Sequence, residues 1–124
     1  MILGIGTDIV EVKRFKKWVS NPAMINRFFN KEEQGTFSSD QRACEHYAVR
    51  FAAKESFGKA LGVGLVGFNF TDVYVRKDHK GKPELVIEDT AKKAVEEIYG
   101  NCKIHLSLSH EKEYATAFVV IESI

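Results

Sequence analysis

The stretch RFAAKESFGKALG, residues 50–62, decides the fold because it closes the longest helical pattern in the chain. Two glycines, Gly58 and Gly62, stand on the same helical stripe as Glu55 and Lys59. A glycine inside a helix costs about 1 kcal/mol relative to alanine. Either the missing side chains make room for something beside the helix, or Gly62 already lies at its end.

The whole helix is expected over residues 39–61, a length of about 33 Å. Its apolar side chains recur at helical spacing and predict one face turned toward the core. Around it, short apolar segments predict about five strands, mostly antiparallel, so the fold class is α+β with the strands wrapped around one long helix. We expect the strands at residues 1–10, 68–78, 83–88, 103–110 and 114–122, and shorter helices at 11–19, 23–29 and 89–100.

Several segments carry further signals. Residues 1–10 are expected to form a buried first strand, and Asn30 with Glu33 has the spacing of a capping box. LGVGLVG, residues 61–67, is too glycine-rich to continue the helix and predicts a loop. AFVVI, residues 117–121, is apolar on both faces, which in a chain this small indicates a subunit interface.

Length and composition restrict the class of protein. The 124 residues suit one domain spanning 1–124, and the net charge of +1 provides no global field to attract nucleic acid. No apolar run approaches the length of a membrane span, and the first residues lack the basic start of a signal peptide. Cys44 and Cys102 lie far apart without zinc-ligand spacing. We therefore expect reduced thiols and a cytoplasmic protein that binds neither nucleic acid nor membrane.

Two carboxylates are candidates for chemistry. Glu55 and Lys59 could form an ordinary exposed pair worth about 0.3–0.5 kcal/mol, or Glu55 could lie at the edge of a cleft that Gly58 leaves open. Asp8 stands in an apolar strand, where an unpaired carboxylate is costly to bury, although a strand end, a helix cap or a salt bridge would also explain it. Two carboxylates from two elements suit Mg²⁺, which usually takes one or two carboxylates plus substrate phosphates.

The segment HLSLSH, residues 105–110, adds polar side chains. Alternation predicts His105, Ser107 and Ser109 on one face of the strand and Leu106, Leu108 and His110 on the other. Each could be an ordinary strand residue. Together with Lys54, Lys59 and Lys82, they offer many donors for a phosphate.

The segment 11–19 is strongly basic. Lys13, Arg14, Lys16 and Lys17 alternate with the aromatic residues Phe15 and Trp18. A solvated basic face is the common explanation. The functional alternative is a docking surface for an acidic helix of another protein, since charge complementarity raises association rates.

These segments together resemble the holo-[acyl-carrier-protein] synthases, the bacterial 4′-phosphopantetheinyl transferases. The resemblance covers nearly the whole chain and rests on four segments in order: GIGTDIVEVKRF, RFAAKESFGKALGVG, GKP at 81–83 and LSLSHEKEYATAFVV. It implies transfer of 4′-phosphopantetheine from coenzyme A to a serine of an apo acyl carrier protein, with magnesium. Adenosine 3′,5′-bisphosphate would be released. It also implies a homotrimer with sites at subunit interfaces, and a role in fatty acid biosynthesis.

The resemblance also implies roles for individual residues. Asp8 and Glu55 would hold the magnesium, and Lys59 would contact the diphosphate of coenzyme A, which makes these three the catalytic residues. His110 would contact the 3′-phosphate. Gly62, Gly64, Lys82 and Pro83 would lie along the nucleotide, and we expect Arg50, Lys54 and Ser109 among the coenzyme A contacts. The carrier protein would dock on the basic segment 11–19 through Lys13, Arg14, Lys17 and Trp18.

Gly58 departs from the family pattern, because some relatives carry a serine at this position. A purely structural oligomer would not need KESFGK beside glycines, but two other functions remain open from the residues alone. A magnesium-dependent phosphodiesterase would use the same carboxylates with water as the nucleophile. A regulatory module would bind coenzyme A without turnover.

Overall fold

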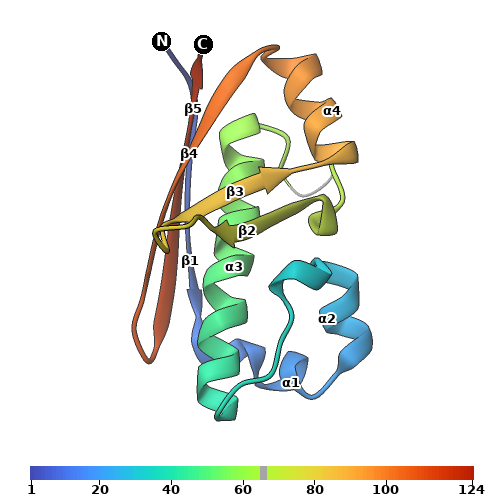
Figure 1. Ribbon diagram of the computed structural model, residues 1–124, viewed down its shortest axis with the longest axis vertical. Helices are drawn as coiled ribbons and strands as arrows, with labels where there is room; N and C mark the ends of the chain where they lie inside the picture. Colours follow the sequence, from blue (N-terminus) through green and yellow to red (C-terminus); the bar gives the residue numbers. More distant parts are fainter. Residues whose placement is uncertain (65–66) are drawn as a thin grey trace.

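The computed structural model describes residues 1–64 and 67–124 (Figure 1). The strands are β1 (Ile2–Glu11), β2 (Val73–Lys77), β3 (Pro83–Ile87), β4 (Cys102–His110) and β5 (Tyr114–Ser123), and the helices are α1 (Lys16–Val19), α2 (Pro22–Phe28), α3 (Asp40–Leu61) and α4 (Asp89–Ile98). Short 3₁₀ turns cover Val12–Phe15, Lys31–Glu33 and Phe70–Asp72. Within the described ranges, no helix is long and apolar enough to cross a membrane.

Helix α3 begins and ends where its sequence predicts. The Ser39 hydroxyl accepts a hydrogen bond from the backbone N–H of Arg42 and so caps the first turn. At the other end, Gly62 takes a left-handed conformation with φ of 80°, and its N–H donates to the carbonyls of Gly58 and Lys59. Gly62 therefore terminates the helix, a position that favours glycine.

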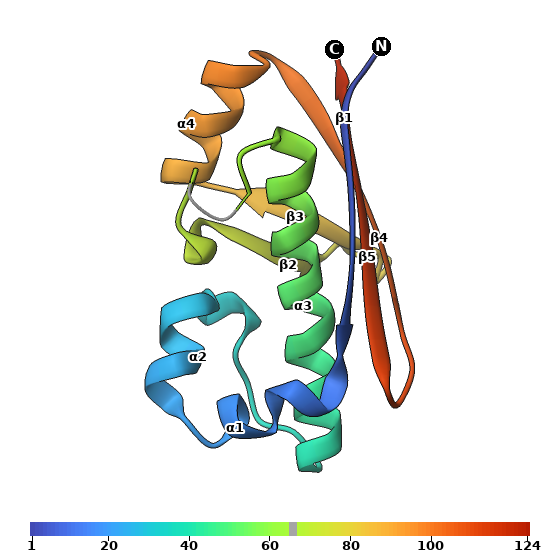
Figure 2. The ribbon, with the colours of Figure 1, turned by 180° about the vertical axis from the view of Figure 1, so that it is seen from behind.

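The strands form two antiparallel sheets. One has the order β1-β5-β4, and the other is the β2–β3 hairpin. Figures 1 and 2 show α3 running along one face of the three-stranded sheet, with the hairpin crossing the helix and the two termini side by side. The α+β class and the long central helix are confirmed.

The sequence predicted a buried first strand, but β1 is buried on one face only. Gly6 and Val10 face α3, whereas Ile5 and Ile9 lie on the outer face with exposed fractions of 61% and 63%. The inner face carries glycine because the helix is too close for a side chain. A Cβ on Gly6 would lie 2.0 Å from the carbonyl oxygen of Ser56.

The strand expected at 68–78 is shorter than predicted. Its first part forms the 3₁₀ turn, because Phe68 and Phe70 stack on each other with ring centroids 5.7 Å apart and pack on Phe57 and Phe51 of α3. The loop predicted at 61–67 includes Leu65 and Val66, which lie outside the described residues.

Candidate functional site

Asp8 and Lys59 meet where β1 crosses α3. Asp8 lies on the inner face of β1, and its side chain is only 16% exposed. The Lys59 ammonium lies 3.3 Å from Asp8 Oδ1 and donates a hydrogen bond to the carbonyl of Thr7 at 3.0 Å. The Lys59 ammonium is therefore paired with Asp8 on β1. The pair of Lys59 with Glu55, one turn earlier on the same helix, is not the one observed.

Glu55 lies one turn before Lys59 on the same helix and is partly buried. Burial raises the pKa of its carboxyl, and the negative charge of Asp8 raises it further, whereas Lys59 and Arg14 act in the opposite direction. Two carboxylates thus repel each other in a half-buried place. A divalent cation would relieve this repulsion, and two carboxylates are the number that Mg²⁺ commonly takes from a protein. Among the described residues, no group of three or more His, Cys, Asp or Glu side chains is placed to hold a metal ion.

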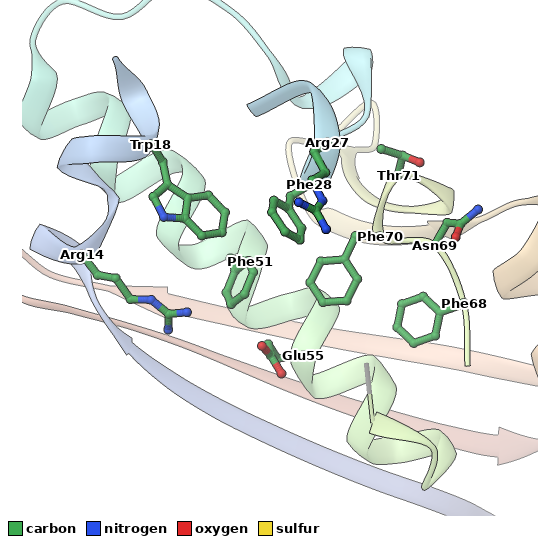
Figure 3. A pocket seen from close by; sticks show the side chains of 10 residues that line it. All are labelled: Arg14, Trp18, Arg27, Phe28, Phe51, Glu55, Phe68, Asn69, Phe70 and Thr71. Carbon is green, nitrogen blue, oxygen red and sulfur yellow. The ribbon is translucent and has the colours of Figure 1, made fainter. Parts of the chain in front are cut away.

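Glu55 also lines an aromatic pocket of about 530 Å³, which we call the Glu55 pocket. Figure 3 shows a band of aromatic rings with Glu55 and Arg14 along one side of it. The Arg14 guanidinium lies 5.2 Å from the centre of the Phe51 ring, a cation–π geometry. The pocket is lined by Arg14, Trp18, Arg27, Phe28, Phe51, Glu55, Phe68, Asn69, Phe70 and Thr71.

A second pocket, of about 290 Å³, lies between α3, β4 and the β2–β3 hairpin, and we call it the α3–β4 pocket. It brings together Arg50, Pro83 and His110, three of the residues expected to contact coenzyme A. It also contains Arg42, His46 and Lys77, which the sequence reasoning did not select. The spacing of Arg42, His46 and Arg50, four residues apart along one helix, is the signal that could have found two of them.

The α3–β4 pocket has a mainly basic lining. Among the described residues, Arg50 Nε is the one buried side-chain polar atom without a hydrogen-bond partner. Burial lowers the pKa of the neighbouring His46 to about 4, with the charge of Arg50 acting in the same direction, so His46 is neutral at physiological pH. Its Nε2 donates to the carbonyl of Glu33. The charged side chains of Arg42, Arg50 and Lys77 in the lining would favour an anionic group.

Comparison with known proteins identifies the family of this chain. Residues 4–119 match the profile of the 4′-phosphopantetheinyl transferase superfamily. The chain is 51% identical over 123 residues to the holo-[acyl-carrier-protein] synthase of Treponema denticola, covering 98% of this chain and 99% of that protein. The synthase of Geobacter sp. is 45% identical over 126 residues, with 98% and 99% covered. The chain belongs to the holo-[acyl-carrier-protein] synthase family.

Solved structures of holo-[acyl-carrier-protein] synthases share the fold. The protein of Neisseria meningitidis is 36% identical with a TM-score of 0.85, over 99% of this chain and 100% of that one. That of Bacillus anthracis, solved in complex with CoA (3′,5′-ADP), is 36% identical with a TM-score of 0.79, over 100% and 99% of the two chains. The recognition of an enzyme of this family from four sequence segments is thereby confirmed.

Lys54 is a correction to the residues expected to contact coenzyme A. Its side chain is fully buried, and its ammonium donates to Glu33 Oε1 at 2.7 Å, to the carbonyl of Phe70 at 3.0 Å and to that of Val73. An ammonium enclosed by three oxygens has no surface left for a phosphate. Lys54 is therefore part of the fold that supports Glu55, and the expected coenzyme A contact is wrong.

Gly58 is a second correction. One alternative from the sequence was that its missing side chain leaves a cleft open beside Glu55. A Cβ on Gly58 would instead lie 2.5 Å from the carbonyl oxygen of Gly64, so the space is filled by the chain that follows the helix. Gly64 itself has a left-handed φ of 64°, and the close packing of this turn is the reason for the glycine at 58.

The remaining predicted residues are spread over the molecule. Ser109 lies on the outer face of the sheet, opposite to His110, as strand alternation predicts. Lys82 lines a small surface pocket at the hairpin, adjoining Pro83. Lys13 is exposed and paired with Glu11 at 3.3 Å, and neither it nor Lys17 lines the Glu55 pocket. Within one chain, the α3–β4 pocket therefore groups Arg50, Pro83 and His110, whereas Ser109, Lys13 and Lys17 line neither this pocket nor the Glu55 pocket.

Proposed function

We propose that this protein transfers 4′-phosphopantetheine from coenzyme A to a serine of an apo acyl carrier protein, with magnesium, and releases adenosine 3′,5′-bisphosphate. The observation that carries the proposal is that Asp8 pairs with Lys59 and that its charge acts on the partly buried Glu55, in a chain of this family. A diphosphate site that worked without a metal would not need a second carboxylate whose charge opposes the ionisation of Glu55.

Asp8 and Glu55 would hold the magnesium ion. When bound, it supplies positive charge that offsets the charge developing on the diphosphate as the phosphorus–oxygen bond breaks. Lys59 is well placed to help, because its side chain is 53% exposed and sits against Asp8. Its ammonium can turn from Asp8 toward the non-bridging oxygens of the substrate, where it stabilises them without moving the backbone.

Coenzyme A would use the α3–β4 pocket for its nucleotide end. Arg50 and Lys77 supply positive charge there, His110 lines the same pocket, and the related Bacillus anthracis protein was solved in complex with CoA (3′,5′-ADP). Gly62, Gly64, Lys82 and Ser109 remain proposed contacts along the nucleotide, supplied at an interface between subunits.

Two subunits would share each site. Arg50 and Glu55 are five residues apart, which places them about 140° apart around α3, and the two pockets have no residue in common. A homotrimer would bring the α3–β4 pocket of one subunit to the carboxylates of another. The outer sheet face offers a surface for this contact, because Ile5, Ile9 and Phe118 are 61%, 63% and 46% exposed there.

The carrier protein would dock on the basic segment 11–19. Arg14 and Trp18 line the Glu55 pocket, so an acidic helix bound to them would bring its serine next to Glu55. Lys13 and Lys17 would steer the acidic partner at longer range. The transfer would be carried out by a single domain, residues 1–124, in the cytoplasm and would serve fatty acid biosynthesis.

Measuring the nucleotide product tests this function. Chromatography should detect adenosine 3′,5′-bisphosphate only when coenzyme A, magnesium and apo carrier protein are all present. The Asp8→Asn variant is the matched control and should release none. Release without a carrier protein would indicate a phosphodiesterase instead, and coenzyme A binding without release would indicate a regulatory module.

A further inference from the structure

Glu45 is a carboxylate in the wall of a pocket that is otherwise positively charged. Arg42, Arg50, Lys77 and His110 line the same α3–β4 pocket. The Glu45 side chain is only 13% exposed, and its Oε1 lies 3.3 Å from Nδ1 of His110. By simple electrostatics, a negative charge here should weaken the binding of a phosphate. Its presence therefore needs an explanation.

Glu45 is held in place from its other side. Gln41, one turn earlier on α3, donates from Nε2 to Glu45 Oε2 at 2.8 Å and to the carbonyl of Lys112 at 3.1 Å. Lys112 belongs to the turn that follows His110 and joins β4 to β5. Gln41 thus fixes Glu45 and anchors the turn next to His110. The Glu45 carboxylate on α3 and the His110 imidazole on β4 are thereby aligned with each other.

The chemistry of the imidazole ring explains why a carboxylate should stand at Nδ1. A carboxylate oxygen beside Nδ1 requires a hydrogen on that nitrogen. A neutral ring with its hydrogen on Nδ1 has a lone pair on Nε2, which would repel a phosphate oxygen. An imidazolium has hydrogens on both nitrogens and can face a carboxylate and a phosphate at once.

We propose that Glu45 is a positioning residue that holds the His110 ring by Nδ1 and so presents an Nε2–H donor to the 3′-phosphate of coenzyme A. This inference rests on the proposed function, in which His110 contacts that phosphate. Glu45 itself does not touch the substrate and acts only through His110.

The substitution Glu45→Gln separates this role from that of a bystander charge, because the two roles predict opposite changes in KM for coenzyme A. A bystander carboxylate repels the phosphate, so its removal should lower KM for coenzyme A. A positioning carboxylate supports the donor, so its removal should raise KM for coenzyme A roughly tenfold, the size expected for losing a hydrogen bond to a charged group. KM for dephospho-coenzyme A, which lacks the 3′-phosphate, should stay unchanged, and so should kcat with either substrate.

A double-mutant cycle with His110→Ala tests whether Glu45 acts through the ring. In the His110→Ala background, Glu45→Gln should no longer raise KM for coenzyme A. Asp40→Asn is the matched control, since it removes a carboxylate on an exposed residue of the same helix that does not line the pocket, and it should behave as the unmodified protein.

Calorimetry measures the binding of nucleotides without any turnover, and so tests the role of Glu45 independently of activity. Glu45→Gln should weaken the binding of adenosine 3′,5′-bisphosphate and leave that of adenosine 5′-monophosphate unchanged. An equal or lower KM for coenzyme A in Glu45→Gln, or an equal rise for both coenzymes, would overturn the proposal. If the unmodified protein binds the bisphosphate but transfers nothing to a carrier protein, the proposed function fails, and the binding comparison still decides the role of Glu45.

Discussion

Lys54 and Glu33 form an ion pair that is fully enclosed by protein. Glu33 also accepts a hydrogen bond from the backbone N–H of Val75 at 3.1 Å, so the pair ties α3 to β2 and to the capping box at Asn30. Burial lowers the pKa of the Lys54 ammonium, and the charge of Glu33 opposes this. The pair thus locks the part of α3 that presents the adjacent Glu55.

Removing one partner of this pair should be costly. We expect Lys54→Met to lower the free energy of unfolding by about 3–5 kcal/mol, because it leaves the Glu33 carboxylate buried without its counter-charge. Urea denaturation measures this loss. The matched control is the half-exposed pair of Arg76 with Glu84, where Arg76→Met should cost far less than Lys54→Met because solvent screens the pair. Equal losses in the two variants would contradict the role assigned to Lys54.

His46 should make stability depend on pH. Burial lowers its folded-state pKa from the usual 6.5 to about 4. Between these two values, the unfolded chain binds a proton at His46 that the folded chain does not. The free energy of unfolding should therefore fall as the pH falls through this window. Denaturation at several pH values should show a flatter profile for His46→Phe than for the unmodified protein, and parallel profiles would contradict the assignment.

At the scale of elements, the close contact of β1 with α3 brings Asp8 within 3.3 Å of the Lys59 ammonium, and this contact depends on glycine. Gly6→Ala should lower the free energy of unfolding by about 1–3 kcal/mol, because its Cβ would clash with the Ser56 carbonyl. Gly35→Ala is the control, because a Cβ at Gly35 meets nothing within 4 Å. Denaturation midpoints of the two variants should differ clearly. Similar midpoints would show that the strand can move away from the helix at little cost.

The elements differ in how far the sequence predicts them. Helix α3 was predictable because its cap at Ser39 and its stop at Gly62 are local signals. The alternation in β4 likewise placed His110 on the inner face. The turn at Phe70 was not predictable, since the rings it packs against come from other parts of the chain. The same holds for Lys77, which reaches the α3–β4 pocket only through the crossing of the hairpin over α3.

At the scale of the whole molecule, the outer sheet face should control assembly. Phe118→Glu places a charge at the centre of the proposed subunit interface and should convert a trimer to monomers in analytical ultracentrifugation, with loss of transfer. Ile98→Glu is the control, because Ile98 is similarly exposed, at 42% against 46%, but lies on α4. A monomeric unmodified protein, or a Phe118→Glu variant that stays trimeric, would contradict the interface.

Shared sites predict complementation between inactive subunits. Asp8→Asn and His110→Ala chains, unfolded and refolded together in equal amounts, should form mixed trimers. About a quarter of their interfaces would combine an intact Asp8 with an intact His110. The mixture should therefore be more active than either variant alone. Activity that only averages the two variants would place both residues in a site formed by one chain.

Intact-mass spectrometry of an apo acyl carrier protein tests the central claim most directly. The carrier is incubated with this protein, coenzyme A and magnesium, with and without a chelator, and in parallel with Asp8→Asn. We expect the carrier to gain one phosphopantetheine mass, and we expect both the chelator and the substitution to abolish this gain. An unmodified carrier in every sample, or a gain that persists with Asp8→Asn, would contradict it.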